Sequence, residues 1–217
     1  MTQPDPTRHV QAIRGLNVLF VMATEQEYGA HLRRMITPLI TGVGPVEAAA
    51  ATGAALAGLA HRGGRPDLVF SLGSAGSRTL EHAGIYQIAS VSYRDMDATP
   101  LGFGRGFTPF LDEPAVIEIP QRLPDVPAAA ISTGGAIITG AAYDAIAADM
   151  VDMESFAVLR AARRLAVPMI GLRGISDGKG DLTGLHDWTE YLHVIDEKLA
   201  AAIEAFAGHV EAGRFAL

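Results

Sequence analysis

Acidic residues and one arginine stand at or just beyond the ends of the strand-like segments of this sequence. Glu25 and Glu27 follow the first apolar run, Arg173 and Asp177 belong to the end of the last one, and Glu154 lies in the stretch "VDMES". A carboxylate can accept a proton from water or stabilise a developing positive charge, and a protonated carboxyl group can assist a leaving group. These residue types are therefore suited to general acid–base chemistry.

Several other chemistries lack their essential groups. The chain has no cysteine, which excludes disulfides, thiolate metal sites and a thiol nucleophile. Its seven histidines are scattered and form no metal-type cluster. The turn "GSAGS" resembles an anion-binding nest, but it is not GxGxxG and no GKS or GKT follows, so dinucleotide and P-loop sites are not indicated. We expect neither a metal nor an organic cofactor.

Each acid also has a purely structural interpretation. Glu25 and Glu27 can interact with the dipole of a helix that begins near Thr24, because Thr24 and Glu27 have capping-box spacing. Asp152 can be the N-cap of the helix after "VDMES", with Glu154 in its first turn. A Gly/Ser turn after a strand is also common. The residue types alone leave these alternatives open.

The order of apolar runs predicts how these residues are positioned. Continuous apolar runs predict buried strands, whereas amphipathic or alanine-rich runs predict helices. Strands that alternate with helices indicate an α/β fold with a largely parallel central sheet, whose ligands bind beyond the carboxyl ends of the strands. The predicted strands are 16–23, 37–44, 66–77, 85–99, 127–139 and 168–180, and the predicted helices are 24–35, 45–63, 153–167 and 188–213.

The composition bounds the size and the surroundings of the protein. With 217 residues, of which 49% are hydrophobic, the chain can bury one large core, and we predict an N-terminal tail at 1–15 and a single domain at 16–217. A net charge of −7 without a basic run argues against nucleic acid or a membrane surface as the main partner. No apolar run could cross a bilayer and the N-terminus lacks a signal-peptide pattern, so we expect a cytoplasmic protein.

Seven motifs occur in the order of one known family. They are "MATEQE", "TGVGPVEAAAAT", "FSLGSAGS", "YRDMDATPLGF", "TGGAII", "VDMES" and "LRGISD", within residues 16–206. Together they resemble the purine nucleoside phosphorylase/nucleosidase family, and within it the branch of 5′-methylthioadenosine/S-adenosylhomocysteine nucleosidases. The resemblance implies a mixed, twisted, partly barrel-like central sheet flanked by helices. It also implies hydrolysis of the N-glycosidic bond of an adenine nucleoside, as in methionine salvage, without a cofactor.

The resemblance implies a role for individual positions. Glu27 matches the general base that activates water, and Asp177 matches the acid that protonates N7 of the departing adenine. Ser74 and Arg173 match residues that position the water. The remaining substrate-binding positions are Val43 on the side of the sugar or 5′-substituent, Ala75 and Gly76 beside Ser74, Met153 and Glu154 at the ribose, and Ile137, Ile138 and Ser176 at the purine.

The implied chemistry suits these residue types. Cleavage of a ribosyl C–N bond builds positive charge on the sugar, which a nearby carboxylate stabilises. Adenine leaves readily only when N7 is protonated, which requires an acid poised by its surroundings. As in an inverting glycosidase, one carboxyl group serves the leaving group and another serves water on the opposite face.

Three features depart from the family pattern. The β-hairpin that usually precedes the "GVG" strand is missing, because Met35 almost directly precedes the next predicted strand, and this predicts a more open pocket. Gly135 stands where an acid often precedes the purine-facing segment. The loop "GFGRGFTPFLDEP" differs from the usual one and carries three aromatic residues, which we expect either in the core or at the interface of a homodimer: Phe103, Phe107 and Phe110.

Other functions stay open. A phosphorolytic enzyme of the same family would need arginines that converge on phosphate, whereas "MATEQEYG" is acidic and favours water. A hydrolase of another 5′-modified nucleoside, such as futalosine or a nucleotide, would suit an open pocket. A nucleoside-binding protein without activity would have little reason to combine Glu27 with Asp177.

Overall fold

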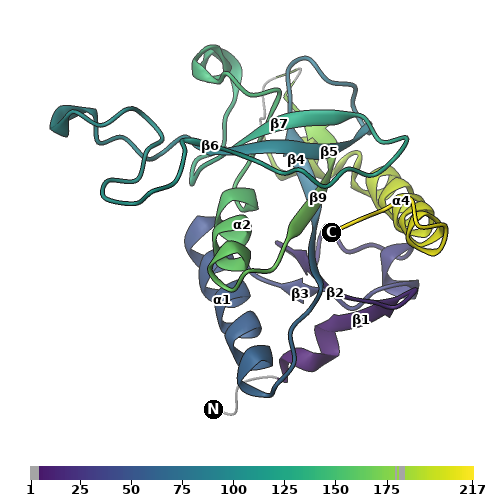
Figure 1. The fold of residues 1–217 in the computed structure, drawn as a ribbon. Coiled ribbons are helices and arrows are strands. Elements are labelled where there is room, and N and C mark those ends of the chain that lie inside the picture. The colour runs from purple at the N-terminus through teal and green to yellow at the C-terminus, as the bar shows by residue number, and fades with distance from the viewer. Residues whose placement is uncertain (1–4, 179, 181–183) are drawn as a thin grey trace.

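The computed structural model of the chain describes residues 5–178, 180 and 184–217. Its strands and helices form one α/β body (Figure 1). Five consecutive strands stand between the first and the second α-helix, so the strict alternation predicted from the sequence is wrong in this part of the chain. The strands are β1 Val10–Ile13, β2 Leu16–Met22, β3 Leu39–Ile40, β4 Leu68–Gly76, β5 Ile85–Tyr93, β6 Val116–Glu118, β7 Ala128–Thr133, β8 Met150–Asp152 and β9 Met169–Asp177, and the α-helices are α1 Pro45–His61, α2 Ser155–Arg164, α3 Leu185–Thr189 and α4 Leu192–Glu211.

Five strands close into a circuit at the centre of the sheet. β4 pairs with β8 and β9, β5 pairs with β7 and β9, and β7 pairs with β8. The β4–β8 and β5–β9 pairs are antiparallel and the other three are parallel. β4 and β9 are buried along nearly their whole length, as expected for the continuous apolar runs of strands covered on both faces. The mixed, partly barrel-like sheet implied by the family resemblance is thus confirmed.

The outer edge of β2 is shared by two short strands. β1 pairs antiparallel with residues 16–19 of β2, and β3 pairs parallel with its last two residues. Arg14 and Gly15 both have positive φ and form the tight turn between β1 and β2. Residues 10–13, which the sequence assigns to a tail, therefore belong to the sheet, while residues 1–4 lie outside the described part of the chain.

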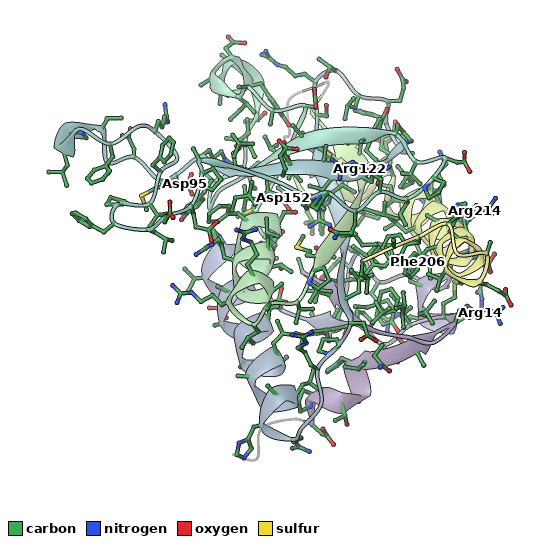
Figure 2. The ribbon with its side chains drawn as sticks, viewed as in Figure 1. Arg14, Asp95, Arg122, Asp152, Phe206 and Arg214 are labelled. Atoms are coloured by element: carbon green, nitrogen blue, oxygen red, sulfur yellow. The ribbon has the colours of Figure 1, made fainter. Side chains whose placement is uncertain are left out.

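Helices cover the two sides of the sheet (Figure 1). α1 and α2 pack together over one buried apolar cluster, and α4 covers a second cluster on the other side. Phe206 of α4 packs edge-on against Phe70 of β4, with ring centroids 5.2 Å apart, on the inner side of its helix (Figure 2). No helix in the described ranges is long and apolar enough to span a membrane. The stripe predicted for α4 is buried throughout: Leu192, Ile195, Leu199, Ile203 and Phe206.

Some predicted elements differ in the structure. The predicted helix at 24–35 is wrong, because this segment forms turns and only a short 3-10 helix at Leu32–Arg34. The described chain between β2 and β3 therefore contains no hairpin. The predicted strand at 37–44 shortens to the two residues of β3, and the predicted last helix divides into α3 and α4. The short strands β1, β6 and β8 were not predicted.

Candidate active site

A pocket of about 580 Å³ opens beyond the carboxyl ends of β2, β4, β8 and β9. This is the edge at which the sequence predicts a ligand site. The pocket is open to solvent on one side, and its wall is mostly apolar with a few carboxyl groups. It is lined by every predicted site residue except Arg173: Glu27, Val43, Ser74, Ala75, Gly76, Ile137, Ile138, Met153, Glu154, Ser176 and Asp177.

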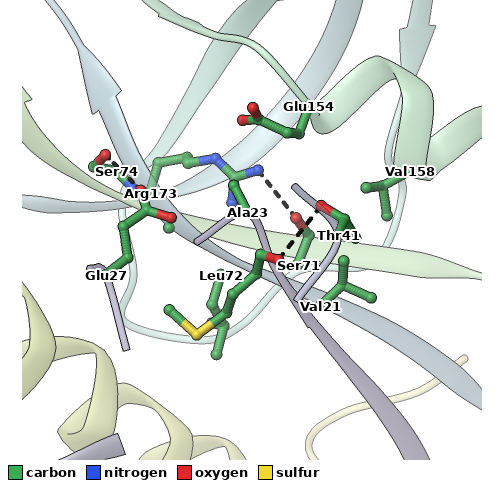
Figure 3. A pocket seen from close by; sticks show the side chains of 12 residues that line it. Val21, Ala23, Glu27, Thr41, Ser71, Leu72, Ser74, Glu154, Val158 and Arg173 are labelled. Atoms are coloured by element: carbon green, nitrogen blue, oxygen red, sulfur yellow. Dashed lines mark hydrogen bonds between the residues drawn. The ribbon is translucent and has the colours of Figure 1, made fainter. Parts of the chain in front are cut away.

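Glu27 reaches the pocket from the turn after β2, and its carboxylate is buried against β4 (Figure 3). The backbone N–H and the hydroxyl group of Ser74 both donate to its Oε1, over 2.7 and 2.6 Å. Its Oε2 is buried and has no hydrogen-bond partner among the described residues. Burial raises the pKa of Glu27, while the bonds from Ser74 and the charge of Arg173 oppose that rise. The predicted capping box with Thr24 is wrong, because this carboxylate binds Ser74 instead.

Close packing at β4 explains why a glycine precedes Ser74. A Cβ atom at Gly73 would lie 3.2 Å from both carboxylate oxygens of Glu27. A side chain at this position would therefore push the carboxylate away from Ser74. The local sequence of β4 thus determines where the carboxylate of Glu27 can lie.

Arg173 is buried and lines a small cavity next to the main pocket (Figure 3). Its guanidinium group forms an ion pair with Asp152, with Nη2 3.1 Å from Oδ2, and also donates to the hydroxyl groups of Ser71 and Ser155. The whole residue Arg173 is 2% exposed, so these protein acceptors enclose its guanidinium group. Arg173 therefore acts on the pocket through its positive charge, which lowers the pKa of Glu27 and of Glu154.

The two acids of "VDMES" have different surroundings: Asp152 forms a buried ion pair, and Glu154 lines the pocket. Asp152 accepts from Thr133 and from the backbone N–H of Ser155, the first residue of α2, over 2.7 and 2.9 Å. Glu154 occupies the N-cap position itself, without a side-chain cap. Its Oε1 accepts from the backbone N–H of Gly44 over 2.8 Å, and Gly44 has a φ of 100° that favours glycine. The prediction that Asp152 is the N-cap and Glu154 a first-turn acid is therefore wrong in position, although Asp152 does bind the start of the helix.

Burial and the nearby charge of Asp152 raise the pKa of Glu154 from 4.5 to about 7. The folded protein thus holds this proton more tightly than the unfolded chain, and its stability falls as pH rises from 4.5 through 7. A shift of this size corresponds to about 3 kcal/mol. We expect the free energy of unfolding of the wild type, relative to Glu154→Gln, to decrease across this range in urea titrations. A difference that does not vary with pH would contradict the shift.

Asp177 ends β9 at the other end of the pocket. The hydroxyl group of Ser176 donates to its Oδ2 over 2.6 Å. Burial raises the pKa of Asp177, and the hydrogen bond from Ser176 opposes that rise. A Cβ atom at Gly76 would lie 2.6 Å from Oδ1 of Asp177 and 2.4 Å from the hydroxyl oxygen of Tyr143. Glycine at position 76 is thus needed for this close approach. A buried carboxyl group with a raised pKa stays protonated at higher pH than an ordinary one, so it can act as a proton donor.

Arg94 lines the pocket but was not among the predicted site residues. Its guanidinium group donates to the carbonyl oxygens of Ser132, Gly134, Ala136 and Asp152. It therefore joins the end of β7 and the end of β8 to the segment that follows Gly134. An arginine in "YRDMD" gives no sequence signal for this role, because its acceptors are backbone groups of distant residues.

Asp95 places a carboxylate next to Gly135, the position at which the family pattern often has an acid. Its Oδ2 accepts from the backbone N–H of Gly135 over 2.5 Å. A carboxylate from the segment after β5 therefore lies beside Gly135, although Gly135 itself has no side chain. Asp95 lies at the base of the projecting loop in Figure 2.

The mouth of the pocket is apolar and includes two residues that the sequence did not indicate, Leu185 and Trp188. Val43 and Ile137 are 55% and 70% exposed at this mouth, and Leu185 of α3 is 72% exposed. Trp188, also on α3, lines the pocket beside them. The chain contains a single tryptophan, and this rarity is the one sequence signal that could have indicated Trp188. Among the described residues no cluster of histidine and acidic side chains is suited to hold a metal ion.

Comparison with known proteins agrees with the fold and with the motifs. Residues 23–210 match the model of the phosphorylase superfamily. A 5′-methylthioadenosine/S-adenosylhomocysteine nucleosidase of Haemophilus influenzae is 29% identical over 184 residues, which cover 76% of this chain and 77% of that protein. A protein with the same name from Hydrogenovibrio crunogenus is 30% identical over 161 residues, covering 65% and 67% of the two chains.

Solved structures agree in fold. The nucleosidase of the same name from Campylobacter jejuni aligns with a TM-score of 0.73 at 18% identity, covering 91% of this chain and 100% of that one. A futalosine hydrolase mutant of Helicobacter pylori aligns with a TM-score of 0.73 at 17% identity, covering 88% and 97%. The closed circuit of strands, the pocket at their carboxyl ends and the match over residues 23–210 agree: the chain belongs to the phosphorylase superfamily.

Proposed function

We propose that this protein hydrolyses the N-glycosidic bond of adenine nucleosides of the 5′-methylthioadenosine/S-adenosylhomocysteine type. The observation that carries the proposal is the pair of carboxyl groups, Glu27 and Asp177, held in one pocket against β4. Glu27 contacts β4 at Gly73 and Asp177 contacts it at Gly76. The two carboxyl groups thus approach β4 at glycines three residues apart, and a base and an acid in one pocket can serve the water and the leaving group respectively.

Each carboxyl group has the environment that its proposed role requires. Glu27 has one oxygen bound to Ser74 and the other free of protein partners among the described residues, so the free oxygen is available to accept a proton from water. Asp177 has a raised pKa and a hydroxyl partner that orients it, which suits proton donation to N7 of adenine. Glu154 lines the same pocket and is proposed to bind the ribose hydroxyl groups, with Met153 packed against the sugar.

The arginines of the pocket favour water over phosphate as the nucleophile. The cationic side chains that line the two cavities, within the described ranges, are Arg94 and Arg173. Arg173 donates to Asp152 and to two serines, and Arg94 donates to four carbonyl oxygens. A phosphate dianion would also face the carboxylates of Glu27 and Glu154. Hydrolysis is therefore the reaction that we propose, rather than phosphorolysis.

The open apolar mouth supports a substrate with an apolar 5′-substituent. Val43, Ile137 and Leu185 are exposed there and offer contact area to a thioether chain. The same openness supports a second candidate, a hydrolase of a nucleoside with a bulkier 5′ group such as futalosine. A panel of nucleosides that differ only in the 5′ group separates the two.

Adenine release tests the proposal directly. We expect the purified protein to release adenine from 5′-methylthioadenosine at the same rate with and without phosphate. Release that requires phosphate would favour a phosphorylase, and no release from any nucleoside of the panel would favour a binding protein without activity. A coupled spectroscopic assay for adenine, with the free ribose product identified by mass spectrometry, distinguishes these results.

We also propose that the protein is a homodimer that acts in the cytoplasm in methionine salvage. The loop between β5 and β6 projects from the body of the protein and carries exposed apolar groups (Figure 1). Phe110 is 95% exposed, Phe107 is 43% exposed, and Phe103 contacts the ring of Phe110 edge-on. Such a surface favours a protein interface over a core. A mass in solution of twice 22.8 kDa is expected for the dimer.

A further inference from the structure

Trp188 is connected to Glu27 by a short chain of hydrogen bonds. The indole Nε1–H of Trp188 donates to Oγ of Ser74 over 3.0 Å. The same Oγ donates to Oε1 of Glu27 over 2.6 Å. Trp188 belongs to α3, Ser74 to β4 and Glu27 to the turn after β2, so three separate elements meet at this point. The contact lies within the pocket wall, because all three residues line the pocket.

The chemistry of the three groups determines in which direction each hydrogen bond is donated. An indole N–H can only donate, and a serine hydroxyl group has a single hydrogen. Because Trp188 donates to Ser74, the hydroxyl group uses a lone pair for the indole and keeps its hydrogen for Glu27. Without the indole N–H, the hydroxyl group would lose this constraint and could rotate away from the carboxylate.

The orientation of the Ser74 hydroxyl group matters because, together with the Ser74 backbone N–H, this group holds one oxygen of Glu27 and leaves the other free. Both donors of Ser74 bind Oε1, and Oε2 has no partner in the described part of the chain. On the basis of the proposed function, we propose that Trp188 is a positioning residue for the general base: it orients the Ser74 hydroxyl group, which holds Oε1 of Glu27 and leaves Oε2 to accept the proton of water.

Other charged groups also act on Glu27 and must be separated from this effect. Arg173 reaches it from β9, Asp152 from β8, and Glu154 from the start of α2. Arg173 lowers the pKa of Glu27, whereas Asp152 raises it. The Ser74 hydroxyl bond lowers it as well, so loss of that bond shifts the acid limb of activity to higher pH. Substitution of Trp188 leaves the three other charged groups in place.

Tryptophan fluorescence tests the hydrogen-bond chain without any assay of activity. Since Trp188 is the single tryptophan, its emission reports this site alone. We expect the emission of the wild type to change with pH as Glu27 titrates, and this change to disappear in Glu27→Gln and Ser74→Ala but to persist in Glu154→Gln. Emission that is the same in wild type and Ser74→Ala across the whole pH range would overturn the proposal.

The kinetics of Trp188→Phe test whether the hydrogen bond from Trp188 contributes to catalysis. Phenylalanine keeps an aromatic ring in the wall and lacks the N–H. We expect kcat to fall about tenfold, as for one lost hydrogen bond in the transition state, with KM within about twofold and the acid limb of kcat/KM moved to higher pH.

Leu185→Ala is the matched control, because it removes an apolar pocket residue from the same helix. It should raise KM and leave the acid limb in place. A fall in kcat of Trp188→Phe with an unmoved acid limb would contradict the positioning role. If the wild type releases no adenine, the proposed function fails, and the fluorescence titration still decides whether the chain of hydrogen bonds exists.

Discussion

Replacement of Asp177 by asparagine is expected to lower kcat for adenine release by about a thousandfold, the typical contribution of general acid catalysis. Asparagine keeps the shape of the side chain and the bond from Ser176 but has no proton to give to N7. Binding should therefore change little, because an amide can still form a hydrogen bond to the purine. Initial rates of adenine release and the Kd of a non-hydrolysed nucleoside analogue separate the two effects.

A substrate whose leaving group needs no proton provides the sharpest control for this variant. Hydrolysis of 4-nitrophenyl riboside should be lowered far less by Asp177→Asn than hydrolysis of 5′-methylthioadenosine. Glu27→Gln should slow both substrates, because both reactions need activated water. If Asp177→Asn slowed the two substrates equally, or retained normal release of adenine, proton donation by Asp177 would be ruled out.

Asp152→Asn is expected to lower the free energy of unfolding by about 3–5 kcal/mol, as when one partner of a buried ion pair is removed. The side chains of Arg173 and Asp152 are 3% and 1% exposed, so the guanidinium charge would stay buried without its counter-charge. The pair links two strands of the circuit, since Asp152 ends β8 and Arg173 lies in β9. The midpoint and slope of urea unfolding measure the change.

The ion pairs of Glu113 give a matched control for that experiment. Glu113 binds Arg160 and Arg163 of α2, and the side chain of Arg163 is 45% exposed. Glu113→Gln should therefore cost only about 1 kcal/mol or less, as for ion pairs near the surface. Equal losses for Asp152→Asn and Glu113→Gln would show that burial of the first pair does not matter for stability.

Long, strongly patterned elements could be predicted from the sequence. The strands β2, β4 and β9 follow from continuous apolar runs, and α4 follows from its apolar stripe, because each signal lies within one segment. The short strands β1 and β8 could not be predicted in this way. Their pairing partners are distant or on the other arm of a hairpin, and three or four residues contain too little pattern.

The predicted site residues came from strand ends and from a family resemblance, and the structure brings all of them except Arg173 to the main pocket. The local sequence signals at Glu27 and Trp188 are misleading. Glu27 has the spacing of a helix cap, but Ser74 of a distant strand binds its carboxylate. Trp188 stands at the first position of the predicted last helix, but its indole group binds Ser74, 114 residues away in the sequence. Such long-range hydrogen bonds leave no periodic trace in the sequence.

The contacts of β4 with both acids have a consequence for how this pocket can diversify. Glu27 and Asp177 both pack against a single strand, at Gly73 and Gly76 of β4, which is buried along nearly its whole length. The mouth, in contrast, is made of α3 and of segments that follow strands. Insertions or substitutions at the mouth can therefore change which nucleosides enter while the packing of the two acids against β4 stays the same. Selection can thus alter substrate preference and bond cleavage almost independently.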